Sequence, residues 1–353
     1  MTKRLSSVAV PNDSVATISP FKPSANWAAS EWPSSISARM RLRRALTALA
    51  LSTVRRVRAV SSRELHPAVE RRTCTGANDV ELVADAYGDP ALPAVLLLHG
   101  GGQTRQSWGN TAATLSAAGF YAVTADLRGH GESGWDPSGD YTLTAHMADV
   151  ERWCAELDRP AIVGASLGGM AGLWTEGTRA GRGQEPAGSC LVLVDIAHRA
   201  DAEGVARIRA FMHGNPEGFA SIDEAADAVA DYLPHRPRPA DTSGLARNLR
   251  LGDDGRYRWH WDPRSMGDGG PRRGIDPDVF ETMARNLHLP VLLVRGGRSD
   301  ILSLETAAEF LALVPHAEFV DVGDAHHMVA GDQNDAFSAA VVEFLTRVAG
   351  RGM

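Results

Sequence analysis

The stretch Gly164-Ala165-Ser166-Leu167-Gly168 decides the fold of this chain. It matches Gly-x-Ser-x-Gly, a pattern in which a serine lies on a strained turn between a strand and a helix. The apolar run Ala161-Ile162-Val163 precedes it, and Met170-Ala171-Gly172-Leu173-Trp174 follows it. This is the order of strand, turn and helix that the pattern requires. We therefore predict that Ser166 is an exposed nucleophile.

Short apolar runs alternate with helical patterns on both sides of this turn. Several of the runs are continuously apolar, which is typical of strands that are covered on both faces. Strands and helices in alternation predict an α/β fold with a mostly parallel sheet flanked by helices. The predicted strands are Val80 to Ala86, Ala94 to Leu98, Tyr121 to Ala125, Ala161 to Val163, Leu191 to Val194, Val291 to Val294 and Glu318 to Val322.

The interval between Asp195 and Val291 breaks this alternation. It has three helical stretches and an aromatic segment at residues 256–261, but no run that reads as a core strand. Because it is too long for an ordinary connection, we predict a helical cap inserted over the carboxyl end of the sheet. The predicted domains are a disordered basic tail at 1–70, the first part of the core at 71–197, the cap at 198–289 and the second part of the core at 290–353.

Composition excludes several classes of protein. Hydrophobic residues at 44% and charged residues at 22% are typical of a globular protein, not a fibrous or disordered one. Residues 1–72 contain 13 Lys and Arg against 4 Asp and Glu, and the remainder contains 23 against 39, which disfavours nucleic acid as a partner of the main body. The sequence contains no run of eighteen apolar residues, so it predicts no membrane-spanning segment. Three cysteines indicate no disulfide framework, and we expect a cytoplasmic protein.

The chain supplies both groups that a serine nucleophile needs. A serine hydroxyl requires a base, and the base requires a third group that fixes its tautomer. Asp300 follows the predicted strand Val291 to Val294, and His327 lies in the loop after Glu318 to Val322. Ser166, Asp300 and His327 therefore form a predicted triad in the chain order Ser, Asp, His.

A loop of consecutive glycines, His99-Gly100-Gly101-Gly102, follows another predicted strand. Oxyanion stabilisation needs backbone donors, and Leu167, directly after Ser166, can supply one of them. We predict Gly101 as the second donor over Gly100 or Gly102. The spacing and the lack of lysine are wrong for a phosphate-binding loop, and no metal or nucleotide signature is visible. We expect no cofactor and no metal.

Together these motifs resemble the α/β-hydrolase superfamily from about residue 72 to 351. Within it the chain is similar to the cap-bearing branch of cofactor-free haloperoxidases, epoxide-hydrolase-like proteins and small esterases. The resemblance implies that the loop from Asp126 to Ser133 is structural, so that His130 is not catalytic. The matching residues are Leu97-Leu98-His99-Gly100, Trp108, Asp126 to Ser133, the turn at Ser166, Asp300 and His327-Met328.

Two positions leave alternatives open. The family has glycine before its histidine, whereas this chain has His326 there, and alignment favours His327. Asp195 occupies the position where some relatives keep an alternative acid, and we expect it to have a structural role. Trp108, Trp259 and Trp261 are candidates for a substrate pocket, although the last two could equally pack the cap's own core.

Serine at the nucleophile position disfavours epoxide hydrolysis and dehalogenation, which in this fold use aspartate. A serine triad forms an acyl-enzyme that water resolves, so we predict hydrolysis of small-molecule esters or lactones. Peracid formation with hydrogen peroxide is the secondary activity that the resemblance implies. A non-catalytic receptor is the alternative of another class, and the presence of all three triad residues disfavours it. The oligomeric state stays open.

Overall fold

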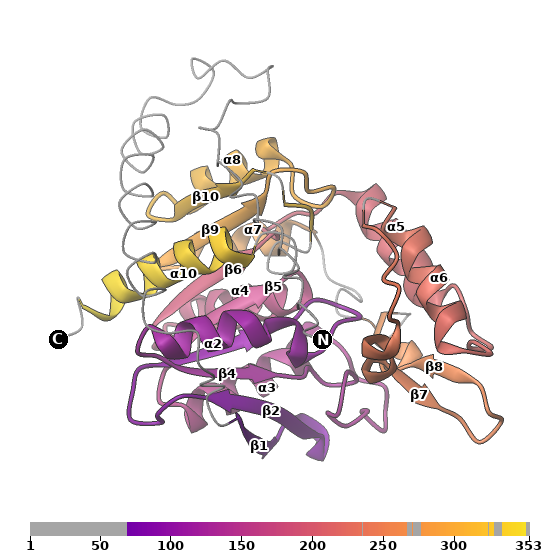
Figure 1. The fold of residues 1–353 in the computed structure, drawn as a ribbon. Coiled ribbons are helices and arrows are strands. Elements are labelled where there is room, and N and C mark those ends of the chain that lie inside the picture. Colours follow the sequence, from indigo (N-terminus) through magenta and orange to yellow (C-terminus); the bar gives the residue numbers. More distant parts are fainter. Residues whose placement is uncertain are drawn as a thin grey trace, which may run out of the picture. The chain divides into compact units, whose positions relative to one another are not determined.

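The computed structural model of the chain describes residues 69–234, 236–266, 270, 277–323, 325–327 and 334–350. All of them lie in one unit, Thr47–Met353. Their centre is an eight-stranded sheet in the order β1-β2-β4-β3-β5-β6-β9-β10 (Figure 1). β1 and β2 are antiparallel to their neighbours and the other six strands are parallel. The strands are β1 (Val69–Thr75), β2 (Glu81–Tyr87), β3 (Ala94–Leu98), β4 (Tyr121–Ala125), β5 (Ala161–Ala165), β6 (Cys190–Val194), β9 (Val291–Gly296) and β10 (Glu318–Val322).

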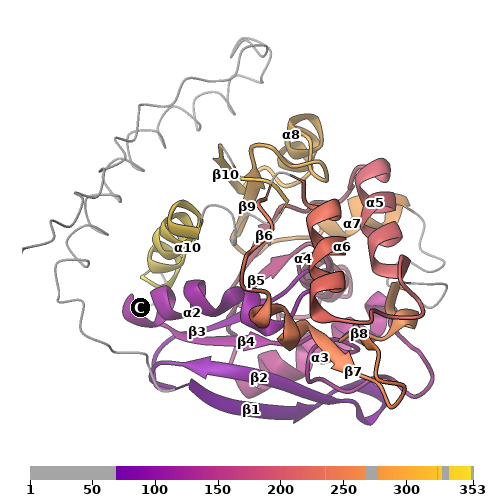
Figure 2. The same ribbon diagram turned by 45° about the vertical axis from the view of Figure 1, so that its right-hand side comes forward.

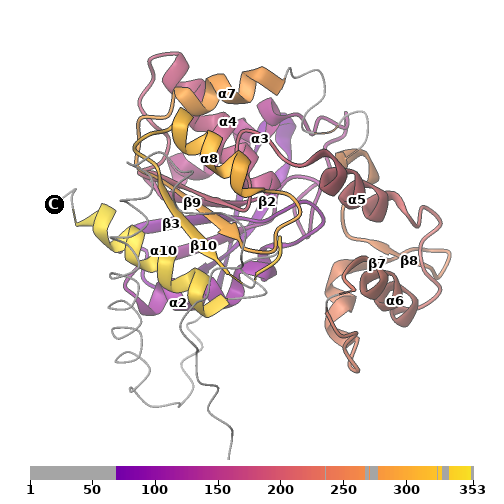
Figure 3. The ribbon, with the colours of Figure 1, turned by 90° about the horizontal axis from the view of Figure 1, so that it is seen from above.

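Helices cover both faces of the sheet. α2 and α10 lie on one face, and α3, α4, α7 and α8 lie on the other (Figure 3). Their bounds are α2 (Gly109–Ala117), α3 (Leu143–Glu156), α4 (Leu167–Gly181), α7 (Pro277–Arg285), α8 (Leu304–Leu313) and α10 (Asn334–Ala349), with short 3-10 turns η1 (Ala77–Asp79) and η2 (Arg105–Trp108). Two of these helices begin at capping hydroxyls, since Thr142 accepts from the N–H of Ala145 and Ser303 from that of Thr306.

The parallel strands carry the core because both of their faces are covered. Every residue of β4, β6 and β9 is buried, including Thr124 and Arg295, and their remaining residues are mostly apolar. The structure has the mostly parallel α/β sheet that the alternation of strands and helices predicted.

The chain between β6 and β9 forms a separate layer, which we call the insert (Ala202–Met266). It contains α5 (Ala202–His213), α6 (Ile222–Tyr232), η3 (Ser243–Asn248), β7 (Leu249–Leu251), β8 (Tyr257–Trp259) and η4 (Pro263–Met266). β7 and β8 pair as an antiparallel two-stranded sheet apart from the core sheet, so the predicted helical cap also contains a small sheet (Figure 2). α7 packs on α4 of the core, where Thr178 Oγ1 lies 3.4 Å from Met283 Sδ.

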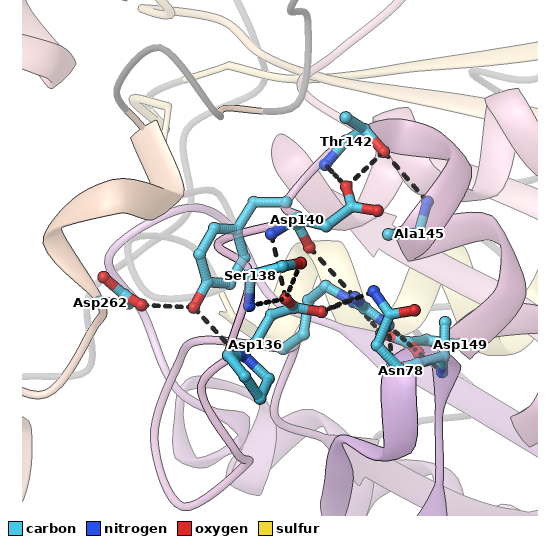
Figure 4. Close-up of polar contacts among 12 residues, drawn as sticks. Asn78, Asp136, Ser138, Asp140, Thr142, Ala145, Asp149 and Asp262 are labelled. Atoms are coloured by element: carbon cyan, nitrogen blue, oxygen red, sulfur yellow. Dashed lines mark hydrogen bonds and ion pairs between the residues drawn. The ribbon is translucent and has the colours of Figure 1, made fainter.

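Buried polar contacts fasten the insert to the core. The Tyr141 hydroxyl donates to Asp262 Oδ2 at 2.5 Å and accepts from the N–H of Asp136 at 3.1 Å (Figure 4). In the core, the buried Arg128 pairs with Asp149 at 2.6 Å and with Asp136 at 3.2 Å. These contacts hold the last turn of the insert against the loop that leads into α3.

The first strand lies partly in the predicted tail. β1 begins at Val69, and Glu70 pairs with Ala86, so residues 69 and 70 belong to the sheet and not to a tail that ends at 70. The rest of the predicted tail lies outside the described residues. Every helix in the described ranges is too short or too polar to span a lipid bilayer.

Candidate active site

Ser166 lies on a strained turn between β5 and α4. Its φ of 44° and ψ of −110° are rare for a residue with a side chain. The turn is possible because a Cβ at Gly164 would lie 2.5 Å from the backbone of Gly168, and one at Gly168 would lie 2.4 Å from the carbonyl oxygen of Leu98. Only glycine fits at both positions. The N-terminal end of α4, with its partial positive charge, then lies beside the serine.

His327 is held by a buried carboxylate. Its Nδ1 lies 2.7 Å from Oδ2 of Asp195, which follows β6 and is fully buried. An ionised carboxylate only accepts hydrogen bonds, so Nδ1 donates its proton and Nε2 is left as the basic nitrogen. Asp195 also accepts from the N–H of Gly296 at 2.8 Å and from the Ser299 hydroxyl.

Asp300 does not occupy the place that the sequence predicted for it. Its carboxylate pairs with Arg207 of α5 at 2.5 Å, and the side chain is 53% exposed. Burial acts to raise the pKa of Asp300, but the hydrogen bond and charge of Arg207, a backbone hydrogen bond and the charge of His327 together outweigh it, so that the pKa lies below its usual value. The residue in contact with His327 is therefore Asp195, to which the sequence assigned a structural role.

The glycine loop approaches the serine closely. A Cβ at Gly100 would lie 3.3 Å from Ser166 Cβ. The N–H of Gly100 donates to Gln103 Oε1 at 2.9 Å, and that of Gly102 donates to His130 Nε2 at 3.2 Å. Among the described residues, the N–H groups of Gly101 and Leu167 have no acceptor. The sequence predicted these two N–H groups as oxyanion donors, and that role stays a prediction.

Two buried imidazoles fix this loop. Leu127 N–H donates to His99 Nε2 at 3.0 Å, so His99 Nδ1 carries the proton and donates to the carbonyl of Gly100 at 2.8 Å. Burial lowers the pKa of His99 to about 4 and, together with neighbouring His99, the pKa of His130 to about 3. Both rings are therefore neutral at ordinary pH, and His130 has the structural place that the resemblance implied.

One cavity of about 530 Å³ joins these groups. Ser166, Leu167, Gly101 and His327 line it, whereas His326 does not. The insert supplies most of the opposite wall. That wall is apolar and aromatic, with residues such as Ile208, Phe211, Met212, Leu245, Trp259 and Trp261.

All three predicted tryptophans reach the cavity wall, but each also packs elsewhere. Trp259 and Trp261 stack with ring centroids 5.0 Å apart, and Trp108 lies 5.8 Å from Phe337 in the core. Trp259 and Trp261 therefore both line the cavity and pack within the insert.

Sequence reasoning missed Ser299 and Gln103. Ser299 holds Asp195, and Gln103 accepts from the glycine loop. Both lie in loops directly after strands, and this position was the only signal that could have pointed to them.

Comparisons with known proteins identify the family of this chain. The model of the alpha/beta hydrolase family matches residues 95–340. Esterase Rv0045c of Mycobacterium tuberculosis is 33% identical over 253 residues, which cover 69% of this chain and 79% of the esterase. The 3-hydroxybutyrate-oligomer hydrolase of Cupriavidus necator is 28% identical over 260 residues, which cover 68% of this chain and 85% of the relative.

A solved structure of the M. tuberculosis esterase has a similar fold. Its TM-score is 0.61 at 26% identity, and the match covers 86% of this chain and 98% of that chain. The family match spans more than half of the chain and includes the turn at Ser166, the glycine loop and His327. This chain therefore belongs to the α/β-hydrolase family.

Proposed function

We propose that this chain hydrolyses carboxylic esters or lactones of small molecules through an acyl-enzyme on Ser166. The chain is an ester-bond hydrolase, as its esterase and oligomer-hydrolase relatives are named. The observation that carries the proposal is the contact of His327 with the buried Asp195, together with the place of His327 and Ser166 in the lining of the same cavity. In this proposal Asp195 takes the role that the sequence gave to Asp300.

The chemistry follows from the positions of these groups. Nε2 of His327 takes the hydroxyl proton as Ser166 Oγ attacks the carbonyl carbon, and Asp195 stabilises the imidazolium that forms. The carbonyl oxygen gains charge and accepts from the N–H groups of Gly101 and Leu167. His327 then gives the proton to the leaving alcohol, and the acyl group stays on Ser166.

Water completes the reaction by the same route. His327 removes a proton from water, the hydroxide attacks the acyl carbon, and Ser166 leaves with the proton that His327 returns. A carboxylic acid and an alcohol are the products.

Ser166→Ala tests the nucleophile. We expect turnover of 4-nitrophenyl esters to fall by about three to six orders of magnitude, because the triad acts as a unit. A fluorophosphonate probe should label the wild type at Ser166 and leave the variant unlabelled. Ser189→Ala is the control, since Ser189 is exposed at the opposite end of β6 from Asp195. Near-normal turnover of Ser166→Ala with unchanged folding would refute the assignment.

A further inference from the structure

Two arginines in the wall of the cavity have no side-chain partner among the residues that the structure describes. Arg209 of α5 and Arg247 of η3 both line the cavity, and both are exposed. Neither side chain makes a hydrogen bond or an ion pair with any residue that the structure describes. Other arginines of the same insert differ, because Arg207 pairs with Asp300 and Arg238 with Asp227.

The position of Arg209 on α5 directs it toward the cavity. Val205, Ile208, Arg209 and Met212 all line the cavity, and their spacing of three and four residues places them on one face of the helix. Arg207 is only two positions from Arg209 and so lies on a different face. A lone guanidinium therefore stands in an otherwise apolar stripe that faces the substrate space.

Among the described residues of the cavity wall, no carboxylate balances this charge. None of the described lining residues is Asp or Glu, although the chain after residue 72 has 39 acidic residues against 23 basic ones. Asp195 is fully buried behind His327 and does not line the cavity. The space above Ser166 is thus apolar with a cationic lining from two separate elements of the insert, and it favours an anion over a cation.

We propose that the substrates are apolar esters that carry a carboxylate, which Arg209 and Arg247 bind. This inference rests on the proposed function of Ser166 and adds the class of substrate. The apolar wall takes the carbon chain, and a guanidinium matches a carboxylate by two parallel hydrogen bonds. The carboxylate can belong to the acid part or to the alcohol part of the ester, and matched substrates separate these two cases.

The test compares pairs of esters that differ only in the carboxylate. For the acid part, the pair is the mono-4-nitrophenyl ester of adipic acid and 4-nitrophenyl hexanoate. For the alcohol part, the pair is 3-(butanoyloxy)butanoate and sec-butyl butanoate, with acid release followed by pH-stat. We expect the ratio of kcat/KM, anionic over neutral, to exceed one in at least one pair, and the pair that shows it identifies the part of the ester that carries the charge.

Arginine variants locate the cause of this preference. Arg209→Gln and Arg247→Gln should each lower the ratio by about three- to tenfold, and the double variant by about ten- to fiftyfold, mainly through KM. Arg182→Gln is the control, because Arg182 is exposed, has no side-chain partner among the described residues and lies outside the cavity. Raising the salt from about 0.05 to 0.5 M should lower the wild-type ratio as well.

The outcomes separate the two proposals. Hydrolysis of the neutral esters with no preference for either anionic ester overturns the inference and leaves the proposed function intact. The same holds if Arg209→Gln, Arg247→Gln and the control Arg182→Gln all leave the ratio unchanged or all lower it equally. Failure to hydrolyse any of the four esters, with the protein folded, overturns the proposed function and the inference with it.

Discussion

Asp195 combines three features that a partner of a catalytic histidine needs. It is fully buried, it contacts His327 Nδ1 at 2.7 Å, and the N–H of Gly296 and the hydroxyl of Ser299 fix its orientation. Its own backbone is in the left-handed region, with a φ of 52°. A non-glycine residue there costs conformational energy, and the surrounding hydrogen bonds hold it in place.

Asp195→Asn should lower kcat by about three to four orders of magnitude. An amide can donate where the carboxylate only accepts, so it favours the imidazole tautomer whose Nδ1 is an acceptor and whose Nε2 cannot take the serine proton. Steady-state kinetics on a 4-nitrophenyl ester measures the loss, and circular dichroism checks the fold. Asp300→Asn is the control and should change kcat by less than about threefold, because it removes an exposed ion pair with Arg207. The reverse pattern would return the acid to Asp300.

The sequence could place both aspartates at the correct edge of the sheet but could not choose between them. β6 and β9 are neighbours in register, with Val194 opposite Val294, so Asp195 and Asp300 both follow carboxyl ends of adjacent strands. The choice depends on side-chain direction and on Arg207, which the insert brings to Asp300. Neither is visible in a local pattern. Ser166 and the glycine loop were easier to identify because their geometry depends on local glycines.

At the scale of elements, neutral histidines join the glycine loop to the insert. His130 accepts from Gly102 N–H at 3.2 Å, and His260, directly after β8, accepts from Gly131 N–H through Nδ1 at 2.7 Å. Burial, together with His130 and His99, lowers the pKa of His260 to about 2. These rings accept backbone hydrogen bonds only while they are unprotonated.

Stability should therefore fall as the pH drops below about 6.5, the ordinary pKa of histidine. Below that pH these histidines are protonated in the unfolded chain. In the folded chain they stay neutral down to a pH of about 4 for His99 and lower for His260. Each such histidine lowers the free energy of unfolding by about 1.4 kcal/mol for each pH unit in that window. His260→Asn keeps an acceptor near the Nδ1 position and should reduce the slope of unfolding free energy between pH 6 and 4, as measured with urea. His213→Asn, exposed at the end of α5, is the control. An unchanged slope in His260→Asn would show that this ring does not act as described.

Elements were predictable to the extent that burial shapes their sequences. The bounds predicted for β3, β4 and β10 match the structure; β3 and β4 are almost wholly buried, whereas in β10, at the edge of the sheet, only Val322 is buried. β1 was missed because only one of its seven residues is buried, which leaves no apolar run. β7 and β8 have three residues each, too few for a periodic pattern.

At the scale of the whole described unit, the insert and the core share the cavity, so their contact controls its shape. Several polar contacts cross between them, and three of these involve the stretch from Arg250 to Asp262: Tyr141 with Asp262, Gly131 N–H with His260, and Arg250 with the carbonyl of Gly131 at 2.8 Å. All three lie beside β7 and β8 or directly after β8. The alternation of strands and helices predicted an insertion at this place, but the partners of its contacts are more than a hundred residues apart in sequence.

Tyr141→Phe should loosen the insert without removing its apolar contacts. The hydroxyl is fully buried and donates to Asp262, which is 1% exposed, so its loss leaves a buried carboxylate with one donor fewer. We expect the free energy of unfolding to fall by about 1–3 kcal/mol. Amide hydrogen exchange in β8 should also accelerate more than exchange in β5, because local opening of the insert becomes easier. Tyr121→Phe is the matched control, since its hydroxyl only accepts from Arg72 at 3.0 Å and lies on β4, away from the insert. Equal acceleration of β8 exchange in both variants, or none in Tyr141→Phe, would mean that the hydrogen bond between Tyr141 and Asp262 does not hold the insert to the core.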